Sequence, residues 1–321
     1  MNYKNIVVAG GGILGSQIAF QTAYSGFNVK ILIREEDSRE EVVSKLEKLH
    51  STYIETINSM ADGSEKNFAR GIVGNSNFDA SDCLNRADNA LSNISIVTSQ
   101  KDALMDADLV IESITENINV KTSFYEAISS LLPENTVVVT NSSTLLPSKL
   151  AKSTGRPSKF LAMHFANSIW KNNIAEIMGH DKTSDESFND VVKFAEAIRM
   201  IPLEAREEKA GYLLNSMLVP FLLSAMDMLA NGISTAEDID KAWTLGTGAP
   251  KGPFQIIDTV GLETAKNIVL QYQKVPNIFD PLLKKMMLPY NFDGMLKILN
   301  EYIEQGKMGK VSGEGFYKYE K

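Results

Sequence analysis

The chain has 321 residues, which is long enough for two domains of about 100–200 residues each. Its hydrophobic content of 44% and charged content of 22% are those of an ordinary soluble globular protein. A net charge of −8 and a pI near 5.1 argue against a nucleic-acid-binding protein, which normally carries a basic face.

The cysteine content and the hydropathy pattern exclude two further classes of protein. Cys83 is the single cysteine, so neither an intrachain disulfide nor a cysteine-rich metal site is possible. No stretch approaches the roughly 18 consecutive apolar residues of a membrane span. We therefore expect a cytoplasmic protein that binds no metal, no membrane and no nucleic acid.

The first elements in chain order form a β-α-β unit. Ile6–Ala9 is a short apolar run, which is typical of a parallel strand buried on both faces. Residues 15–25 predict a helix that ends at Gly26, and Val29–Ile33 predicts the second strand. A unit of this length is typical of mononucleotide-binding folds.

The loop between the first strand and the helix is rich in glycine. Gly10-Gly11-Gly12-Ile13-Leu14-Gly15 fits the pattern G-x-G-x-x-G. In that pattern the first glycine forms a tight turn, the second lets the backbone approach a pyrophosphate, and the third packs the helix closely. The helix N-terminus adds free N–H groups for the phosphates. We predict that a dinucleotide is bound by Gly10, Gly12, Ile13, Leu14 and Gly15.

The end of the second strand bears on the choice between NAD and NADP. An acidic residue there would bond the hydroxyls of the adenosine ribose, but the chain has Ile33-Arg34. Arg34 could pair with a 2′-phosphate, because a guanidinium group binds phosphate in a planar fork. Alternatively, Arg34 is solvated and Glu35 reaches the ribose. Both cofactors therefore remain open.

The alternation of strands and helices continues to about residue 200. Ser38-Arg39-Glu40-Glu41 has the spacing of a capping box and predicts the start of a long polar helix, whereas residues 74–95 predict turns. Further strands are predicted at 94–97, 108–112, 136–140, 160–165 and 174–178, with helices near 101–106 and 118–132. This order predicts an α/β fold of the Rossmann type, with a doubly wound, largely parallel sheet.

The pattern changes after Pro202. Ala210–Asn231 has apolar residues at helical spacing, and further helices are predicted at 236–245, 262–272, 280–287 and 293–304. We therefore predict a dinucleotide-binding domain over residues 1–200, with a helical insertion near 38–70, and an all-helical domain over residues 201–321.

The first candidate catalytic residue is His164. It lies in Met163–Asn167 at the end of a predicted strand, which is where open α/β sheets bind ligands. Histidine exchanges protons near neutral pH, and a carboxylate such as Glu176 in the next strand can orient the ring and stabilise its charged form. Considered alone, His164 could also be a histidine with a purely structural role.

Three further polar clusters follow predicted strands or begin the long helix: Glu112–Asn117 with Lys121, Thr140–Ser143, and Ala210–Asn215. Together with Met163–Asn167, their order resembles the 3-hydroxyacyl-CoA dehydrogenase family, and within it the 3-hydroxybutyryl-CoA dehydrogenases. The resemblance runs from residue 6 to the C-terminus and includes Gly252–Phe254 and Gly313–Tyr317.

The resemblance implies a role for each matching residue. It implies that His164 is the catalytic base, that Glu176 is its partner, and that Ser143 and Asn215 bond the substrate oxygen. It implies a homodimer formed by the helical domain, and a helical hairpin within residues 38–70 that covers an acyl-CoA. By the same resemblance, the nicotinamide side of the cofactor is contacted by Glu116, Lys121, Ser143 and Asn167.

The implied reaction is hydride transfer between a nicotinamide cofactor and the 3-hydroxy or 3-keto carbon of a short-chain acyl-CoA. Ser168 departs from the family, which usually has proline there, and Ile33 stands where aspartate is usual. Only Lys45 and Lys48 are candidates for contacting the Coenzyme A phosphates. A dehydrogenase of a free hydroxy acid, of the carnitine or gulonate type, is therefore an alternative. A non-catalytic dinucleotide-binding protein is a more remote one.

Overall fold

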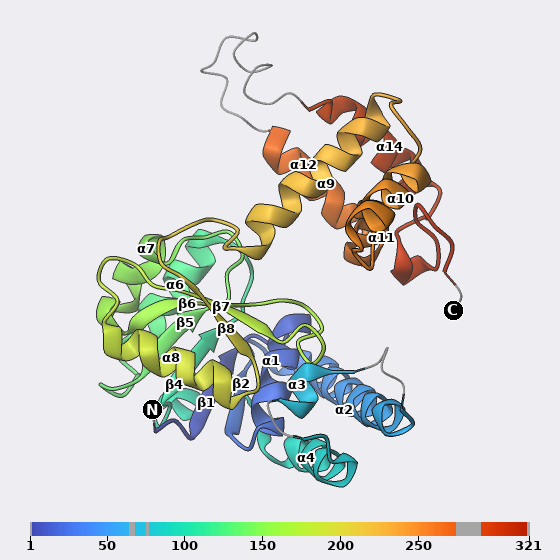
Figure 1. Cartoon of the computed structure of the whole chain (residues 1–321). Coiled ribbons are helices and arrows are strands. Elements are labelled where there is room, and N and C mark those ends of the chain that lie inside the picture. The colour runs from blue at the N-terminus through green and yellow to red at the C-terminus, as the bar shows by residue number, and fades with distance from the viewer. Residues whose placement is uncertain (1, 64–67, 75–76, 274–289, 320–321) are drawn as a thin grey trace. The chain divides into compact units, whose positions relative to one another are not determined.

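The computed structural model describes residues 2–63, 68–74, 77–273 and 290–319. The chain forms two compact units, Met1–Leu213 and Leu214–Lys321 (Figure 1). The division lies beyond the boundary predicted near residue 200. The reason is that β8 (Ile201–Ala205) pairs with β7 (Ile174–Met178) and so belongs to the sheet of the first unit.

One eight-stranded sheet organises the first unit, in the order β3-β2-β1-β4-β5-β6-β7-β8. Every neighbouring pair is parallel except β6 and β7. The predicted doubly wound α/β fold is therefore confirmed. The remaining strands are β1 (Asn5–Ala9), β2 (Asn28–Leu32), β3 (Ile94–Val97), β4 (Leu109–Glu112), β5 (Val137–Thr140) and β6 (Phe160–Phe165).

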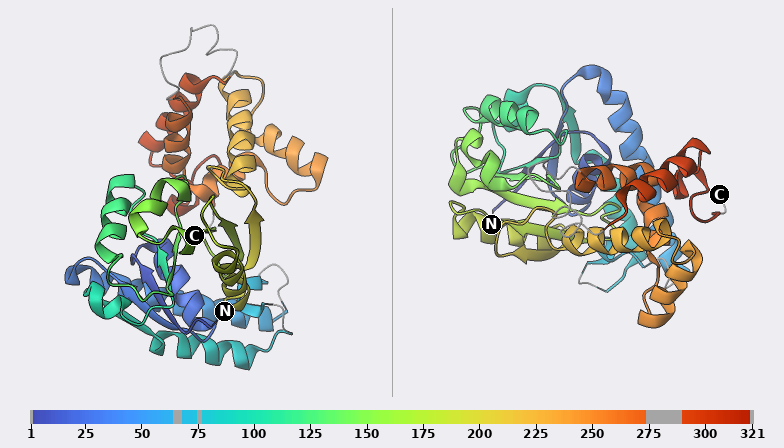
Figure 2. Two further views of the ribbon diagram at one scale, coloured as in Figure 1. Left: turned by 90° about the vertical axis from the view of Figure 1, so that its left-hand side faces the viewer. Right: turned by 90° about the horizontal axis from the view of Figure 1, so that it is seen from above.

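Helices cover both faces of this sheet (Figures 1 and 2). Successive strand residues point to opposite faces, so Ile6 and Val8 join one hydrophobic core while Val7 joins another. The core around Ile6 receives side chains from α1 (Ile13–Tyr24), α2 (Arg39–Ala61), α3 (Arg70–Val73), α4 (Ala80–Ser92) and α8 (Asp185–Ala197). The core around Val7 receives them from α5 (Gln100–Leu104), α6 (Ile118–Ile128) and α7 (Pro147–Leu150).

Helix α4 lies where the sequence predicted turns, so that prediction was wrong. Asp79 caps the helix, since its Oδ1 accepts a 3.1 Å hydrogen bond from the Asp82 N–H. The buried face is narrow and consists of Cys83, Ala87 and Ala90. These three small residues have helical spacing, but the polar residues around them hid the apolar stripe.

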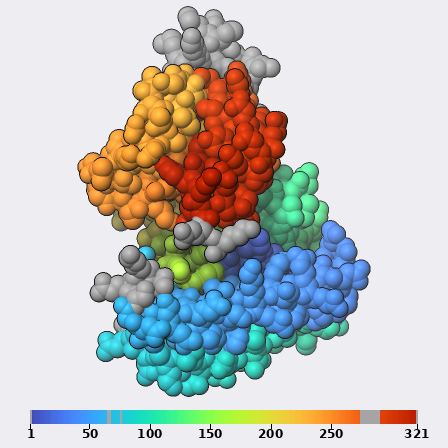
Figure 3. Space-filling view, turned by 90° about the vertical axis from the view of Figure 1, so that its right-hand side faces the viewer, coloured from blue at the N-terminus to red at the C-terminus, as the bar shows by residue number. Residues whose placement is uncertain are grey.

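Helices α2 and α4 pack against each other, and Figure 3 shows them side by side on one surface of the first unit. A helical hairpin was predicted within residues 38–70. In the structure the helix that packs against α2 is α4, which lies beyond residue 70. The predicted capping box at Ser38 was also wrong. Ser38 already has helical dihedral angles, φ −81° and ψ −8°, and its side chain makes no capping hydrogen bond. Glu41 instead forms an ion pair with Lys45 at 2.7 Å.

The described part of the second unit is helical, with a core of its own. Asp258 is buried on helix α11 (Pro253–Val260), and it accepts hydrogen bonds from the Phe316 and Tyr317 N–H groups and from the Tyr319 hydroxyl. These bonds tie the C-terminal segment to α11. The helix predicted at 280–287 lies outside the described residues. The helices are α9 (Leu214–Ala230), α10 (Ala236–Thr247), α11 (Pro253–Val260), α12 (Leu262–Gln273) and α14 (Phe292–Glu304).

Across the described ranges, no helix is both long enough and apolar enough to cross a membrane.

Candidate active site

The glycine loop lies where the strand order reverses, between β1 and β4. Gly10 follows β1 with φ +113°, and a Cβ atom there would lie 2.4 Å from the Ser113 carbonyl oxygen. A Cβ atom at Gly15 would lie 2.1 Å from the Gly10 carbonyl oxygen, whereas one at Gly12 would meet nothing within 4 Å. Two glycines therefore permit close backbone packing, and the third leaves open space above the N-terminus of α1. Such a crevice is where open α/β sheets bind dinucleotides.

A cavity of about 710 Å³ borders this loop. Of the predicted cofactor residues, Gly10, Gly12 and Arg34 line it. The others do not belong to its lining: Ile13, Leu14, Gly15, Glu116, Lys121, Ser143 and Asn167. Among described residues no acidic side chain lies in the first turn of α1 and none caps it, so the helix N-terminus suits a phosphate.

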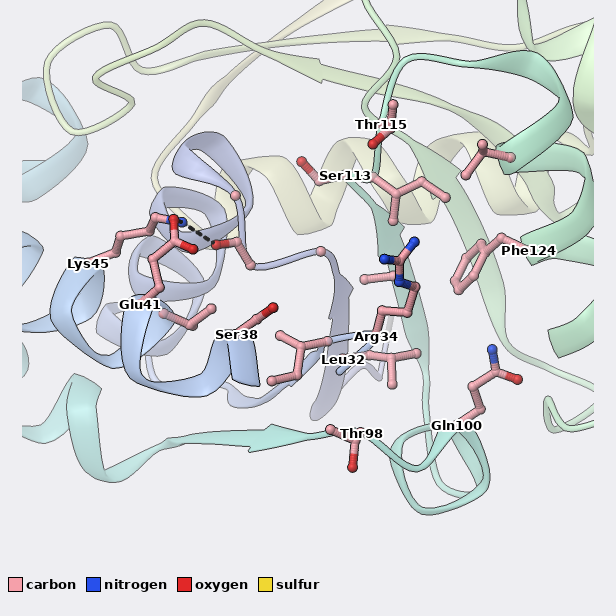
Figure 4. A pocket seen from close by; sticks show the side chains of 18 residues that line it. Leu32, Arg34, Ser38, Glu41, Lys45, Thr98, Gln100, Ser113, Thr115 and Phe124 are labelled. Carbon is pink, nitrogen blue, oxygen red and sulfur yellow. Dashed lines mark hydrogen bonds and ion pairs between the residues drawn. The ribbon is translucent and has the colours of Figure 1, made fainter. Parts of the chain in front are cut away.

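Two cationic side chains border the cavity (Figure 4). The Arg34 side chain is 90% exposed, extends into the cavity, and pairs with Glu35 at 2.7 Å. Lys45, a candidate for Coenzyme A contact, lies here instead, and its Nζ donates to the Gly11 carbonyl oxygen at 3.0 Å. Lys45 thus supports the glycine loop. Lys48 is exposed and is not part of this lining.

His164 and Glu176 form a buried pair on the antiparallel strands β6 and β7. They are directly opposite each other in the register, so their side chains point to the same face of the sheet. His164 Nδ1 lies 2.9 Å from Glu176 Oε2, and the two residues are 6% and 1% exposed. The carboxylate therefore fixes the ring, and Nε2 faces away from it.

Ser143 lies on the other side of the imidazole. It follows β5, and its Oγ is 3.1 Å from His164 Nε2. Three predicted catalytic residues are thus joined by successive contacts in the order Ser143, His164, Glu176, and we call these three residues the catalytic line. Asn215 is in the first turn of α9, in the second unit, and its role stays a prediction.

Beneath this line is a buried carboxylate, Glu112, at the end of β4. Its Oε1 accepts hydrogen bonds from Lys121 Nζ at 2.5 Å and the Ile114 N–H at 2.8 Å. Its Oε2 accepts from the Tyr125 hydroxyl at 2.7 Å and the Thr140 hydroxyl at 2.8 Å. Glu112 therefore joins β4, α6 and β5 directly behind the turn that carries Ser143.

Glu116 organises that turn from the outside. It accepts hydrogen bonds from the hydroxyls of Ser142 and Thr144 and from the Thr144 N–H. Burial acts to raise the pKa of the Glu116 carboxyl, but these hydrogen bonds and the charge of Lys121 outweigh it and hold the pKa below its usual value. Glu116 and Lys121 are thus engaged with protein groups, and their predicted contacts with the cofactor remain predictions.

The segment after β6 has an unusual backbone. Asn167 is exposed, and Ser168 adopts φ +59°, a left-handed conformation that few residues other than glycine take. The Ser168 N–H donates to Gln17 Oε1 at 2.8 Å. This bond ties the end of the histidine strand to α1. A proline, which the resemblance described above leads us to expect here, could neither adopt this φ nor donate this hydrogen bond.

Ser168→Pro is therefore expected to lower the free energy of unfolding by about 3 kcal/mol. Urea denaturation followed by circular dichroism measures the change. Ser168→Gly is the matched control, because glycine keeps the N–H and favours a positive φ, and it should unfold at or above the wild-type urea concentration. Equal stability of the proline and glycine variants would show that the left-handed conformation is not required.

The sequence did not reveal two residues that contact the site. Tyr212 stacks on the His164 ring, with centroids 4.6 Å apart and an interplanar angle of 11°. Gln17 holds the loop after β6 although it lies on α1. A polar residue on the buried face of α1 was a signal for Gln17, whereas no spacing rule indicated the contact of Tyr212 with His164.

Comparisons with known proteins place both units in one protein family. The family model described as the NAD binding domain of 3-hydroxyacyl-CoA dehydrogenase matches residues 5–208. The model described as the C-terminal domain of 3-hydroxyacyl-CoA dehydrogenase matches residues 211–319. Together they span nearly the whole chain.

Individual relatives are similar over most or all of their length. Human mitochondrial hydroxyacyl-coenzyme A dehydrogenase is 31% identical over 98% of this chain and 91% of its own. A probable 3-hydroxybutyryl-CoA dehydrogenase of Bacillus subtilis is 29% identical over 100% and 99%. A solved structure of a diketoreductase, whose description is substrate-directed dual catalysis of dicarbonyl compounds, is 41% identical over 99% of this chain and 100% of its own. Its TM-score is 0.82. The chain therefore belongs to the 3-hydroxyacyl-CoA dehydrogenase family.

Proposed function

We propose that this protein is a nicotinamide-dependent dehydrogenase that interconverts 3-hydroxyacyl-CoA and 3-ketoacyl-CoA, with His164 as the general acid and base. The alignment of Ser143, His164 and Glu176, joined by contacts of 3.1 and 2.9 Å, carries the proposal. Its membership of the family supplies the substrate class.

The geometry suits removal of a proton from a secondary alcohol. If Nδ1 donates its hydrogen to Glu176, the neutral imidazole has its lone pair on Nε2. A substrate hydroxyl placed beside Ser143 could then give its proton to Nε2. A bound nicotinamide supplies the hydride chemistry. Glu176 stabilises the imidazolium that results, because its carboxylate is buried beside the ring.

In the reverse direction the imidazolium returns the proton to the developing alkoxide. The Ser143 hydroxyl is close enough to Nε2 to donate to the same oxygen. We propose that Asn215 assists there. Donors of this kind are worth about 3–4 kcal/mol in comparable electrostatic sites.

A second candidate function is the reduction of keto or dicarbonyl compounds that carry no Coenzyme A. The diketoreductase, at 41% identity over the whole chain, favours it. The placement of Lys45 at the glycine loop also favours it, since that residue is then not free to bind a Coenzyme A phosphate. A free hydroxy acid would be the corresponding substrate in the oxidation direction.

One assay separates these functions. Purified protein is given NADH or NADPH with acetoacetyl-CoA, acetoacetate or a dicarbonyl compound without Coenzyme A, and the loss of absorbance at the nicotinamide band is followed. Turnover of acetoacetyl-CoA with the highest kcat/KM supports the first proposal. A preference for the dicarbonyl compound or acetoacetate supports the second. Cofactor binding without turnover of any substrate contradicts both.

We further propose that Arg34 lets the enzyme use NADPH as well as NADH. Arg34 lines the cavity where the adenosine ribose would lie, and Ile33 before it offers no carboxylate to the ribose hydroxyls. The guanidinium can pair with a 2′-phosphate in place of Glu35.

Arg34→Asp is expected to raise KM for NADPH by about 10- to 100-fold, since a charge-assisted hydrogen bond is replaced by repulsion. KM for NADH should fall or stay constant, because an aspartate can bond the ribose hydroxyls. Lys48→Asp makes the same charge change outside the cavity lining and should alter neither constant. If Arg34→Asp left the ratio of the two KM values unchanged, Arg34 would have no part in cofactor choice.

We also propose that the helical unit forms a homodimer in the cytoplasm. Several of its large apolar side chains are exposed, among them Met217 at 68%, Ile233 at 71% and Leu245 at 84%. Burial of such residues commonly drives association. A chain with one cysteine, which forms no disulfide in the structure, suits the reducing cytoplasm. Sedimentation equilibrium tests the dimer, and a mass equal to one 35.4 kDa chain would contradict it.

A further inference from the structure

Tyr212 and Leu213, at the end of the first unit, make three contacts with the catalytic line and with the turn that carries Ser143. The first is the stack of the Tyr212 ring on the His164 imidazole, with centroids 4.6 Å apart and planes only 11° from parallel. Tyr212 is 1% exposed, so the phenol ring is buried against the imidazole. Glu176 contacts the imidazole at Nδ1, and Tyr212 packs on its face.

The second contact reaches the serine turn. The Tyr212 hydroxyl donates a 2.7 Å hydrogen bond to the carbonyl oxygen of Ser142, the residue before Ser143. Burial, together with the carboxylates of Glu116 and Glu176, raises the pKa of the phenol well above its usual value. The hydroxyl therefore remains a neutral donor throughout the physiological range.

The third contact is made by the next residue. The Leu213 N–H donates a 2.9 Å hydrogen bond to Glu176 Oε1, the carboxylate oxygen that does not face His164. To place these groups, Tyr212 adopts φ +52°, which costs about 1–2 kcal/mol for a residue other than glycine. Such a conformation persists only where surrounding contacts hold it, and it is often found at functional sites.

We propose that Tyr212 is a positioning residue for the reaction: its ring sets the plane of the His164 imidazole and its hydroxyl sets the turn that carries Ser143. One side chain thereby fixes the distance between the proton acceptor and the hydroxyl that bonds the substrate oxygen. The inference rests on the proposed function, because it assigns Tyr212 to the site of that reaction.

Two substitutions separate the ring from the hydroxyl. Tyr212→Phe keeps the stack and removes the bond to Ser142, and it should lower kcat about fivefold, as expected for loss of one hydrogen bond. Tyr212→Leu removes both, and it should lower kcat about 10- to 50-fold. KM for the cofactor should not change in either variant, since Tyr212 does not line the dinucleotide cavity.

Tyr24→Phe is the matched control. Tyr24 is also 1% exposed in the first unit, and its hydroxyl donates to a backbone carbonyl, that of Ile72, at 3.2 Å. Its removal costs a comparable buried hydrogen bond away from the catalytic line. The control should lower the melting temperature as much as Tyr212→Phe does and leave kcat unchanged.

Nuclear magnetic resonance tests the geometry without any turnover. The chain has three histidines, so ¹⁵N-histidine labelling gives few imidazole signals, and His164→Gln identifies the one from His164. A stacked phenol ring shifts the neighbouring ring protons upfield. The shift should persist in Tyr212→Phe and disappear in Tyr212→Leu, while Tyr24→Phe should retain it.

The outcomes are distinct. The positioning role is supported if kcat falls from wild type to Tyr212→Phe and again to Tyr212→Leu while KM for the cofactor stays constant. The upfield shift should also be lost in Tyr212→Leu. Unchanged kcat in both variants overturns it. So does a loss that vanishes when rates are normalised to the folded fraction, which would mark Tyr212 as structural only. If wild-type protein turns over no substrate, the proposed function fails, and an unchanged His164 signal in Tyr212→Leu would separately refute the stacking.

Discussion

Replacing His164 with alanine is expected to lower kcat by about 10²- to 10⁴-fold in both directions, which is the usual contribution of a general acid or base. The reason is that the remaining side chains of the catalytic line, Ser143 and Glu176, cannot take over the proton at the position of Nε2. Steady-state kinetics with the preferred ketone and its alcohol measures the effect.

The dissociation constant of the cofactor should stay within about twofold of wild type in this variant, because His164 is not part of the dinucleotide cavity. His50→Gln is the control, since His50 pairs with Asp88 at the surface of the first unit. A His164→Ala protein that kept more than about a tenth of the wild-type kcat would remove His164 from the chemistry, because general acid or base catalysis is worth more than that.

Glu112→Ala is expected to lower the free energy of unfolding of the first unit by about 3 kcal/mol, the lower end of the cost of removing one partner of a buried ion pair. Lys121 is 1% exposed, loses its 2.5 Å partner, and keeps only the more distant Glu116 carboxylate at 3.5 Å. The hydroxyls of Tyr125 and Thr140 lose their acceptor as well. Urea denaturation monitored by circular dichroism gives the difference.

Two further proteins make this test specific. Asp106→Ala removes a surface ion pair of similar length, 2.6 Å to Lys30, and should cost less than about 1 kcal/mol. The double variant Glu112→Leu with Lys121→Met removes both buried charges and should regain part of the loss. If Glu112→Ala cost no more than Asp106→Ala, the buried pair would not be holding β4 to α6.

The sequence predicted the parts of the site that depend on strand order. The glycine loop and two polar clusters were each predicted to follow a strand, and parallel strands β1, β4 and β5 end at one edge of the sheet. The register also places the predicted partner Glu176 opposite His164. The contact between Ser143 and His164 also follows from that edge.

Two kinds of contact could not be predicted: those that require an unusual backbone conformation, and those whose hydrogen-bond partners come from several distant segments of the chain. The position of Tyr212 requires a left-handed conformation that the sequence gives no reason to expect outside glycine. Glu112 stood in a recognised polar cluster, but its four donors come from three segments of the chain: the turn after β4, helix α6 and strand β5. Helix α4 was not predicted because its buried stripe consists of small residues, which contribute little to a hydrophobic pattern.

The antiparallel pairing of β6 with β7 has a consequence for how the chain can vary in length. His164 and Glu176 meet because they are cross-strand neighbours, so the number of residues in the connection at 166–173 does not set their distance. A longer or shorter connection would preserve the pair. A single residue inserted within β6 before His164 would instead turn the imidazole to the opposite face of the sheet, away from Glu176 and Ser143. Tolerance to insertion and deletion should therefore change abruptly at the ends of these two strands.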